Sequence, residues 1–179
     1  MDFKLVLGKL IKAFNDQGIR YGLIGGFALG VWGVGRATAD IDFLVNRDDL
    51  ENVNEIMRTI GYKVGFRSEN VTHFISDEVK YGNVDFLHSF RQPSLEMLGR
   101  TEKKDVLGGE IIIMVVRPED IIGLKVQAIA NNPNRGKNDL ADIESLISAQ
   151  KDRLDWRLIE KYFKIFDMID LFEKLRGAK

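Results

Sequence analysis

The 179-residue sequence contains no cysteine, two histidines and three prolines. The absence of cysteine excludes disulfide bonds, thiolate metal sites and cysteine nucleophiles. No apolar run approaches the roughly 20 residues that a membrane-spanning helix needs. The net charge is −1, so no overall basic excess indicates nucleic-acid binding, and any RNA contact must come from a local patch. The first residues resemble an amphipathic helix and not a signal peptide, so we expect a cytoplasmic protein that does not bind membranes.

The hydrophobic pattern predicts a mixed α/β front and a helical last third. Helices are expected at 3–16, 27–32, 48–60, 93–98, 118–130, 137–149 and, as one long helix, 155–175. Strands are expected at 21–24, 41–45, 62–66, 71–76, 83–88 and 110–116. The expected fold class is α/β (α+β), a mixed β-sheet flanked by helices. We expect a core at 1–117 and a helical C-terminal part at 118–179 that packs on it, the two forming one structural domain.

The most informative motif is a pair of aspartates, Asp40 and Asp42, at the start of an expected strand. Alternation along a strand directs both carboxylates to one face, about 7 Å apart. Carboxylates this close repel each other unless a divalent cation lies between them, and oxygen ligands suit Mg²⁺. The pattern indicates a phosphoryl- or nucleotidyl-transfer site. The alternative is a solvated strand face, and the preceding Arg36 and Thr38, which can bind phosphate, argue against it.

The glycine pair Gly25-Gly26 follows one expected strand and precedes a helix. Glycines at such a turn allow backbone N–H groups to approach phosphate oxygens closely. The alternative is an ordinary tight turn, because the sequence has neither the full dinucleotide-binding fingerprint nor a Walker lysine motif. Taken alone, the pair is a weak signal.

Two further charged residues interrupt apolar patterns. Asp85 lies in an apolar strand, where it would complete a metal site with the first two aspartates, orient or deprotonate an acceptor hydroxyl, or have only a structural role. Lys125 lies near the middle of the apolar arc of its helix. Its side chain either reaches an anion or extends to solvent along the apolar surface.

The last group of candidates lies in the expected helix 137–149. Asp139 is inside the buried arc and Asp142 is beside it, and helix capping or pairing with the helix dipole is the alternative for Asp139. Lys137 could bind a phosphate or only solvent. His73 and His88 do not form a metal cluster, and His73 is a candidate for lining a pocket.

Together these residues resemble the nucleotidyltransferase superfamily with the DNA polymerase β-like fold. The shared pattern is a glycine pair, then the segment Arg36-x-Thr38-x-Asp40-Ile41-Asp42, then a third acid on a later strand. The sequence is more narrowly similar to the AbiEii-type toxin nucleotidyltransferases, which add a lysine and a basic-x-Asp-x-x-Asp stretch. Gly26 departs from the pattern, since many members have a serine there.

The resemblance implies a function and a set of roles. Asp40, Asp42 and Asp85 would bind Mg²⁺ and act in catalysis with Lys125, which would neutralise charge in the transition state. A nucleoside triphosphate (NTP) would be the substrate, and the nucleotide-binding residues would be Gly25, Gly26, Arg36, Thr38, Lys137 and Asp139. Asp139 would support either the nucleotide pocket or Lys125. A toxin of this kind would act on tRNA or a protein and would have an antitoxin as partner.

Two other functions stay open at this point. One is a catalytically silent protein that binds a nucleotide or a partner, although the complete set of three acids favours an enzyme. The other is a nucleotidyltransferase that modifies a small molecule such as an antibiotic. An acidic acceptor pocket would support that function, and its candidate residues are Glu69, Asp77 and Glu78.

Overall fold

The computed structural model describes residues 1–177, except for the side chain of Arg135. The chain divides into two compact units, each described here by itself. The first comprises Met1–Val31 and Arg36–Val116, and the second comprises Trp32–Gly35 and Arg117–Lys179. No helix within the described residues is long and apolar enough to cross a membrane.

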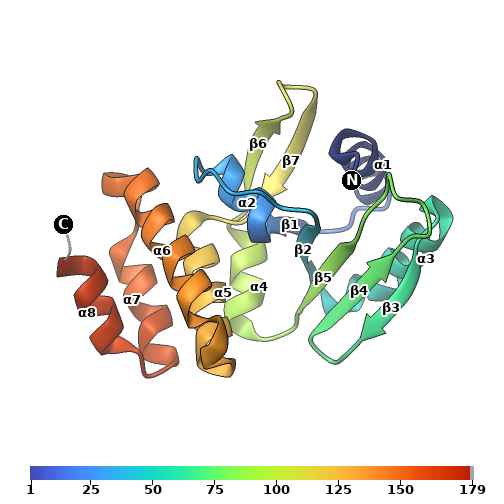
Figure 1. Ribbon diagram of the computed structural model, residues 1–179. Coiled ribbons are helices and arrows are strands. Elements are labelled where there is room, and N and C mark those ends of the chain that lie inside the picture. The colour runs from blue at the N-terminus through green and yellow to red at the C-terminus, as the bar shows by residue number, and fades with distance from the viewer. Residues whose placement is uncertain (178–179) are drawn as a thin grey trace. The chain divides into compact units, whose positions relative to one another are not determined.

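A seven-stranded mixed sheet forms the centre of the first unit, in the order β3-β4-β5-β2-β1-β7-β6 (Figure 1). The pairs β2–β5 and β1–β7 are parallel, and the remaining neighbours are antiparallel. The strands are β1 (Tyr21–Ile24), β2 (Ile41–Asn46), β3 (Lys63–Arg67), β4 (Val71–Ile75), β5 (Val84–Ser89), β6 (Glu102–Val106) and β7 (Ile111–Val115). The helices of this unit are α1 (Phe3–Asp16), α2 (Gly25–Val31), η1 (Arg47–Asp49), α3 (Leu50–Ile60) and α4 (Gln92–Gly99).

An aromatic cluster binds α1 to the buried face of the sheet. The Phe14 ring of α1 contacts Phe43 edge-on at 5.5 Å and Phe86 at 6.1 Å, and the rings of Phe43 and Phe86 stack at 5.6 Å. Phe74 packs edge-on against Phe86 from the next strand. Because side chains alternate along a strand, burying these rings on one face directs Asp42 and Asp85 to the other face.

The second unit is helical. Its elements are α5 (Pro118–Asn131), η2 (Pro133–Arg135), α6 (Gly136–Gln150), η3 (Lys151–Arg153), α7 (Trp156–Ile165) and α8 (Ile169–Gly177). Helices α5 and α7 approach closely at Gly123, where an added Cβ would lie 2.7 Å from the Tyr162 ring. The Tyr162 hydroxyl donates to Asp120 Oδ1 at 2.6 Å, so a buried hydrogen bond fixes the same contact.

The predicted α/β class with a mixed sheet is confirmed, and three details of the prediction were wrong. Strand β6 was missed because Glu102–Val106 is largely polar and lies at the edge of the sheet. The helix predicted at 155–175 is two helices, separated by Asp167, which has a left-handed φ of 55°. Helix α2 begins at Gly25 and not at residue 27, because Gly25 reverses the chain at a φ of 67°.

Candidate active site

Two carboxylates meet on one face of the sheet in the first unit. Asp42 of β2 and Asp85 of β5 are partners in the parallel ladder between these strands. Laterally paired residues direct their side chains to the same face, so the two carboxylates are neighbours. The residues that flank Asp42, Ile41 and Phe43, are fully buried on the opposite face. The apolar core therefore fixes the direction in which this acid pair points.

The glycine pair packs directly against this site. A Cβ added at Gly25 would overlap the Asp42 carboxylate, and one added at Gly26 would lie 2.8 Å from Thr38 Oγ1. Both positions therefore need glycine for close approach, and Gly25 also needs it for its left-handed φ. The Thr38 side chain fills the space that a side chain at position 26 would need.

The segment before β2 supplies the other predicted residues of this unit. Thr38 Oγ1 donates to the carbonyl oxygen of Asp40 at 3.1 Å, which fixes the bend that precedes the strand. Asp40 lies in that bend, half-buried, and Arg36 is exposed. The strand itself begins at Ile41, so Asp40 precedes the ladder in which Asp42 is paired.

His73 is a site residue whose pairing the sequence did not indicate. It is the partner of Asp85 in the antiparallel ladder between β4 and β5, and His73 Nδ1 lies 2.7 Å from Asp85 Oδ1. The available signal was a polar residue at an alternating position of a strand, and the sequence cannot identify its cross-strand partner. The third acid is thus oriented by an imidazole on its outer side.

The remaining predicted residues lie in the second unit. Lys125 of α5 bridges two acids of α6, because its Nζ lies 2.9 Å from Asp139 Oδ1 and 2.6 Å from Asp142 Oδ2. The three side chains are 12%, 5% and 11% exposed, respectively. This is a buried ionic cluster between antiparallel helices. Lys137, two residues before Asp139 on α6, is exposed.

Three acids considered for an acceptor pocket are exposed and paired with basic side chains. Asp77 pairs with Lys63 at 2.7 Å, Glu78 with Lys80 at 2.6 Å, and Glu69 with Arg47 at 3.4 Å. These contacts belong to the surface of the first unit. The structure does not gather the three acids into one pocket wall.

The donor chemistry of the acid pair suits a hard divalent cation. Asp42 and Asp85 offer carboxylate oxygens on one face, which are the ligands that Mg²⁺ takes together with phosphate oxygens. Among residues 1–177, no group of three or more acidic or histidine side chains is close enough to hold a metal ion by itself. The carboxylate oxygens of the pair suit a cation that also takes oxygen ligands from a triphosphate.

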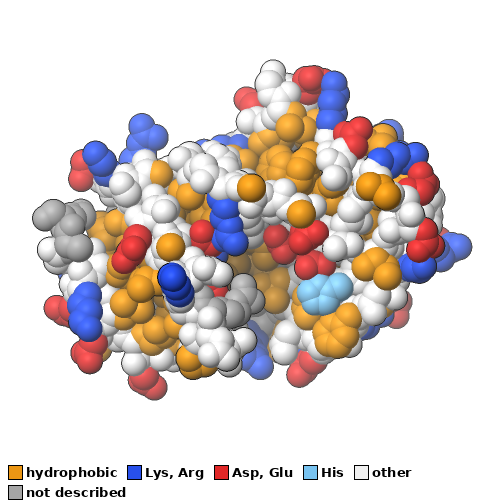
Figure 2. All heavy atoms as spheres, in the orientation of Figure 1, with side chains coloured by type: hydrophobic (Ala, Val, Ile, Leu, Met, Phe, Trp, Pro, Cys, Tyr) orange, Lys and Arg blue, Asp and Glu red, His pale blue; other side chains and the backbone are white. Residues whose placement is uncertain are grey.

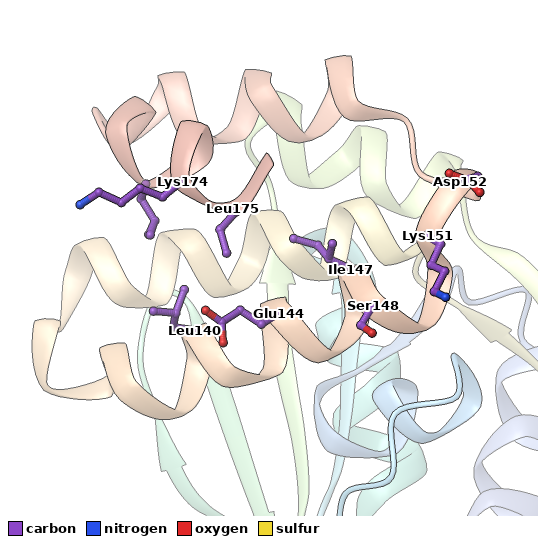
Figure 3. Close-up of a pocket in the computed structure, with 9 residues that line it drawn as sticks. Leu140, Glu144, Ile147, Ser148, Lys151, Asp152, Lys174 and Leu175 are labelled. Carbon is purple, nitrogen blue, oxygen red and sulfur yellow. The ribbon is translucent and has the colours of Figure 1, made fainter. Parts of the chain in front are cut away.

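A separate cavity lies within the second unit. It has a volume of about 640 Å³ and is lined by Leu140, Glu144, Ile147, Ser148, Lys151, Asp152, Leu171, Lys174 and Leu175. Figure 3 shows Leu175 directed toward α6, and Lys174 extending away from the cavity. None of the residues predicted for the catalytic or nucleotide site lines this cavity.

The mixed seven-stranded sheet matches a nucleotidyltransferase-like fold. The chain belongs to the family described as uncharacterised nucleotidyltransferase, whose sequence profile matches residues 4–165. It is therefore a nucleotidyl-transfer enzyme. No curated protein matches the chain.

Solved structures share the fold at low sequence identity. The antibiotic-resistance factor ANT(2'')-Ia is 14% identical with a TM-score of 0.69, and the match covers 97% of this chain and 99% of that one. The lincosamide antibiotic adenylyltransferase LnuA is 16% identical with a TM-score of 0.58, covering 82% and 97%. An antigenic nucleotidyltransferase-like protein from Paracoccidioides brasiliensis is 15% identical with a TM-score of 0.59, covering 98% and 92%. At these identities the likeness establishes the fold alone.

Proposed function

We propose that the protein transfers a nucleoside monophosphate from an NTP to a hydroxyl group of an acceptor, with Mg²⁺ as cofactor. The observation that carries this proposal is the pairing of Asp42 with Asp85, beside a glycine at which no side chain fits. Phosphate oxygens can approach the backbone there, and the carboxylates lie next to them. This is the charge arrangement that an Mg²⁺–triphosphate complex requires.

The three acids share the metal and the acceptor in this proposal. Asp40, Asp42 and Asp85 would hold the metal-bound triphosphate, and Asp85 also orients the acceptor hydroxyl and accepts its proton. Bound magnesium supplies positive charge that stabilises the phosphate oxygens during in-line displacement. His73 holds the Asp85 carboxylate at 2.7 Å, which limits the orientations that this general base can adopt.

The glycines and Thr38 form the phosphate-binding side of the site. Gly25 and Gly26 bring backbone N–H groups to the phosphates without a side chain between them. Thr38 packs against Gly26 and fixes the bend at Asp40. Arg36 lies two residues before Thr38 and is exposed. It is the cation of this segment, and its guanidinium group can bind phosphate oxygens bidentately.

Lys125, Asp139 and Lys137 are assigned to the nucleotide in this proposal through the resemblance. The buried pairs of Lys125 with Asp139 and Asp142 hold its ammonium group in one position. An ammonium fixed in this way is suited to neutralise charge that develops on phosphate oxygens. Lys137 is exposed and is not part of this buried ionic cluster, and it is assigned to a phosphate of the nucleotide.

The acceptor has two candidate identities, a macromolecule and a small molecule. The resemblance to AbiEii-type toxins implies transfer to tRNA or to a protein, with an antitoxin as partner. A small-molecule hydroxyl is the second candidate, and one observation favours it. The match to the antibiotic-resistance factor ANT(2'')-Ia covers 97% of this chain and 99% of that one, so the two chains are similar in length.

The reaction is tested with labelled nucleotides. The purified protein is incubated with Mg²⁺, each NTP labelled at either the α- or the γ-phosphate, and a cell extract separated into RNA, protein and small molecules. We expect label from the α-phosphate in one fraction, which identifies the acceptor class. Transfer of γ-label would instead show phosphoryl transfer. If NTP raises the melting temperature without any transfer or pyrophosphate release, the protein is a silent nucleotide-binding protein.

A further inference from the structure

The acid pair belongs to a longer row of side chains that crosses four strands. Asp42 pairs with Asp85, Asp85 with His73, and His73 with Phe66 of β3. Laterally paired residues share a face of the sheet, so the row runs from the acids through an imidazole to a phenyl ring. Figure 2 shows acidic, histidine and hydrophobic side chains next to one another on the visible face.

A bulge places Phe66 at the end of this row. The register between β3 and β4 shifts between Val64 and Phe66, so Gly65 is the extra residue. A bulge of this kind redirects the side chains of an edge strand. The Phe66 ring lies 5.5 Å from the His73 ring at an interplanar angle of 34°. Phe66 is 55% exposed, so much of the ring is open to solvent.

A single exposed apolar residue needs no explanation by itself. Phe66 differs because its ring contacts the His73 ring. The His73 imidazole in turn contacts the carboxylate of Asp85, one of the two acids. Neighbouring strands are about 4.8 Å apart, so Phe66 lies two strands, or roughly 10 Å, from Asp85. A base and its attached ribose bridge a gap of this kind.

From this row we infer that Phe66 and His73 bind the acceptor, which is a nucleoside, by stacking its base on Phe66. The sugar then lies over His73 and presents a hydroxyl to Asp85. This inference rests on the proposed nucleotidyl transfer and adds the acceptor class and its binding residues. Base–aromatic stacking is a common mode of nucleobase recognition because every base has a π-face.

The arrangement also separates donor from acceptor. Gly25 packs on the Asp42 end of the row, whereas Phe66 lies beyond Asp85 at the other end.

The acceptor hydroxyl oxygen forms a bond to the α-phosphorus, and the bond from that phosphorus to the β-phosphate oxygen breaks. Pyrophosphate leaves with the electron pair, and the hydroxyl proton passes to Asp85 and then to water. In-line transfer requires the acceptor hydroxyl and the leaving pyrophosphate to lie on opposite sides of the α-phosphorus.

The negative charges of Asp42 and Asp85 indicate that the acceptor nucleoside carries no phosphate beside these two residues. The two acids of the row repel phosphate oxygens, and the nearby Lys63 is already paired with Asp77 at 2.7 Å. Binding of a nucleic-acid backbone relies on several Lys or Arg contacts to phosphates. We therefore expect adenosine to bind better than AMP when no metal is present.

The test uses tryptophan as a reporter of stacking. In Phe66→Trp, an indole replaces the phenyl ring at the proposed stacking position. The matched control is Ile112→Trp, at another strand residue that is 59% exposed. Adenosine and AMP are titrated in EDTA while indole fluorescence is recorded. We expect saturable quenching by adenosine in Phe66→Trp only, with a dissociation constant at least threefold lower than for AMP. Equal quenching in both variants, or tighter AMP binding, would overturn the inference.

Two further measurements separate this inference from the proposed function. Phe66→Ala should raise the KM for the nucleoside acceptor roughly 5- to 150-fold, as expected for loss of base stacking, while the KM for NTP stays unchanged and Phe66→Tyr restores the acceptor KM. A change confined to the KM for NTP would assign Phe66 to the donor base and refute the inference. Fluorescence quenching requires no turnover, so quenching without pyrophosphate release in the wild type would refute only the proposed transfer reaction.

Discussion

Asp42 and Asp85 are directly opposite each other on neighbouring parallel strands, although 42 residues separate them in the sequence. The aromatic cluster on the other face fixes the direction of both side chains. Two adjacent carboxylates repel each other unless a cation or a proton is shared between them.

Magnesium should stabilise the wild-type protein through the acid pair. A ligand at ten times its dissociation constant raises the free energy of unfolding by about 1.4 kcal/mol. We expect Mg²⁺ with a non-hydrolysable NTP analogue to raise the melting temperature of the wild type but not of Asp85→Asn, and chelation to reverse the rise. Equal stabilisation of the Asp85→Asn protein would place the metal elsewhere.

Replacing Gly25 by alanine should impair the site more than the fold. The added Cβ would overlap the Asp42 carboxylate, and the left-handed φ of 67° costs a non-glycine residue about 1–2 kcal/mol. We expect transfer to fall at least 100-fold. The control is Gly30→Ala, in the same helix, where an added Cβ meets nothing within 4 Å. Full activity in a folded Gly25→Ala protein would show that close approach at this position is not needed.

Removing the charge of Lys125 should destabilise the second unit. Asp139 and Asp142 would keep their buried carboxylates without the ammonium that bridges them. Breaking a buried ion pair from one side costs about 3–5 kcal/mol, so Lys125→Met should show a loss of this size in urea unfolding. Lys164→Met, which breaks an exposed pair with Glu160, should cost less than about 1 kcal/mol. Equal effects of the two variants would contradict this account.

The buried His88 should make stability depend on pH. Its Nδ1 lies 2.9 Å from the Glu69 carbonyl oxygen and therefore carries the proton, while Nε2 lies 3.0 Å from Thr72 Oγ1 and accepts from it. Burial lowers the pKa of His88 below its ordinary value of 6.5, and the charges of Arg47 and Arg67 lower the pKa further. The unfolded chain then binds a proton at a pH where the folded protein does not.

The free energy of unfolding should accordingly fall as the pH drops through 6.5 toward the lower folded-state pKa of His88. Urea unfolding of the wild type at pH 7.5, 6.5 and 5.5 measures this slope. His88→Gln keeps polar groups at the position but does not titrate, so its slope over this range should be smaller. An unchanged slope would exclude His88 as the cause.

Most of the fold follows from periodicity, because the core strands and the helices α1, α3 and α5 have regular apolar patterns. Strand β6 lacks such a pattern, since Glu102–Val106 is mostly charged. The break between α7 and α8 also escaped prediction, because the apolar pattern continues past Asp167 and no glycine or proline marks the turn. Aspartate tolerates a left-handed φ better than most residues do.

The candidate site was predictable as a set of residue types but not as a set of contacts. The sequence identifies Asp42 and Asp85 as acids on apolar strands, and the sheet order then makes them neighbours. It contains no signal for the pairing of His73 with Asp85 or for the bulge that presents Phe66, because both depend on strand register. Lys125 and Asp139 were predicted on apolar helix faces, and Asp142 proves to be a second partner of the same lysine.

The central claim is that the acid pair catalyses nucleotidyl transfer, and pyrophosphate release tests it most directly. Release from NTP is measured with Mg²⁺ and cell extract for the wild type, for Asp42→Asn, and for Asp77→Asn as an exposed acidic control in the same unit. We expect Asp42→Asn to lower the rate at least 100-fold, about 2.7 kcal/mol in activation free energy, with an unchanged circular dichroism spectrum, and Asp77→Asn to match the wild type. A folded Asp42→Asn protein that releases pyrophosphate at the wild-type rate would contradict the claim.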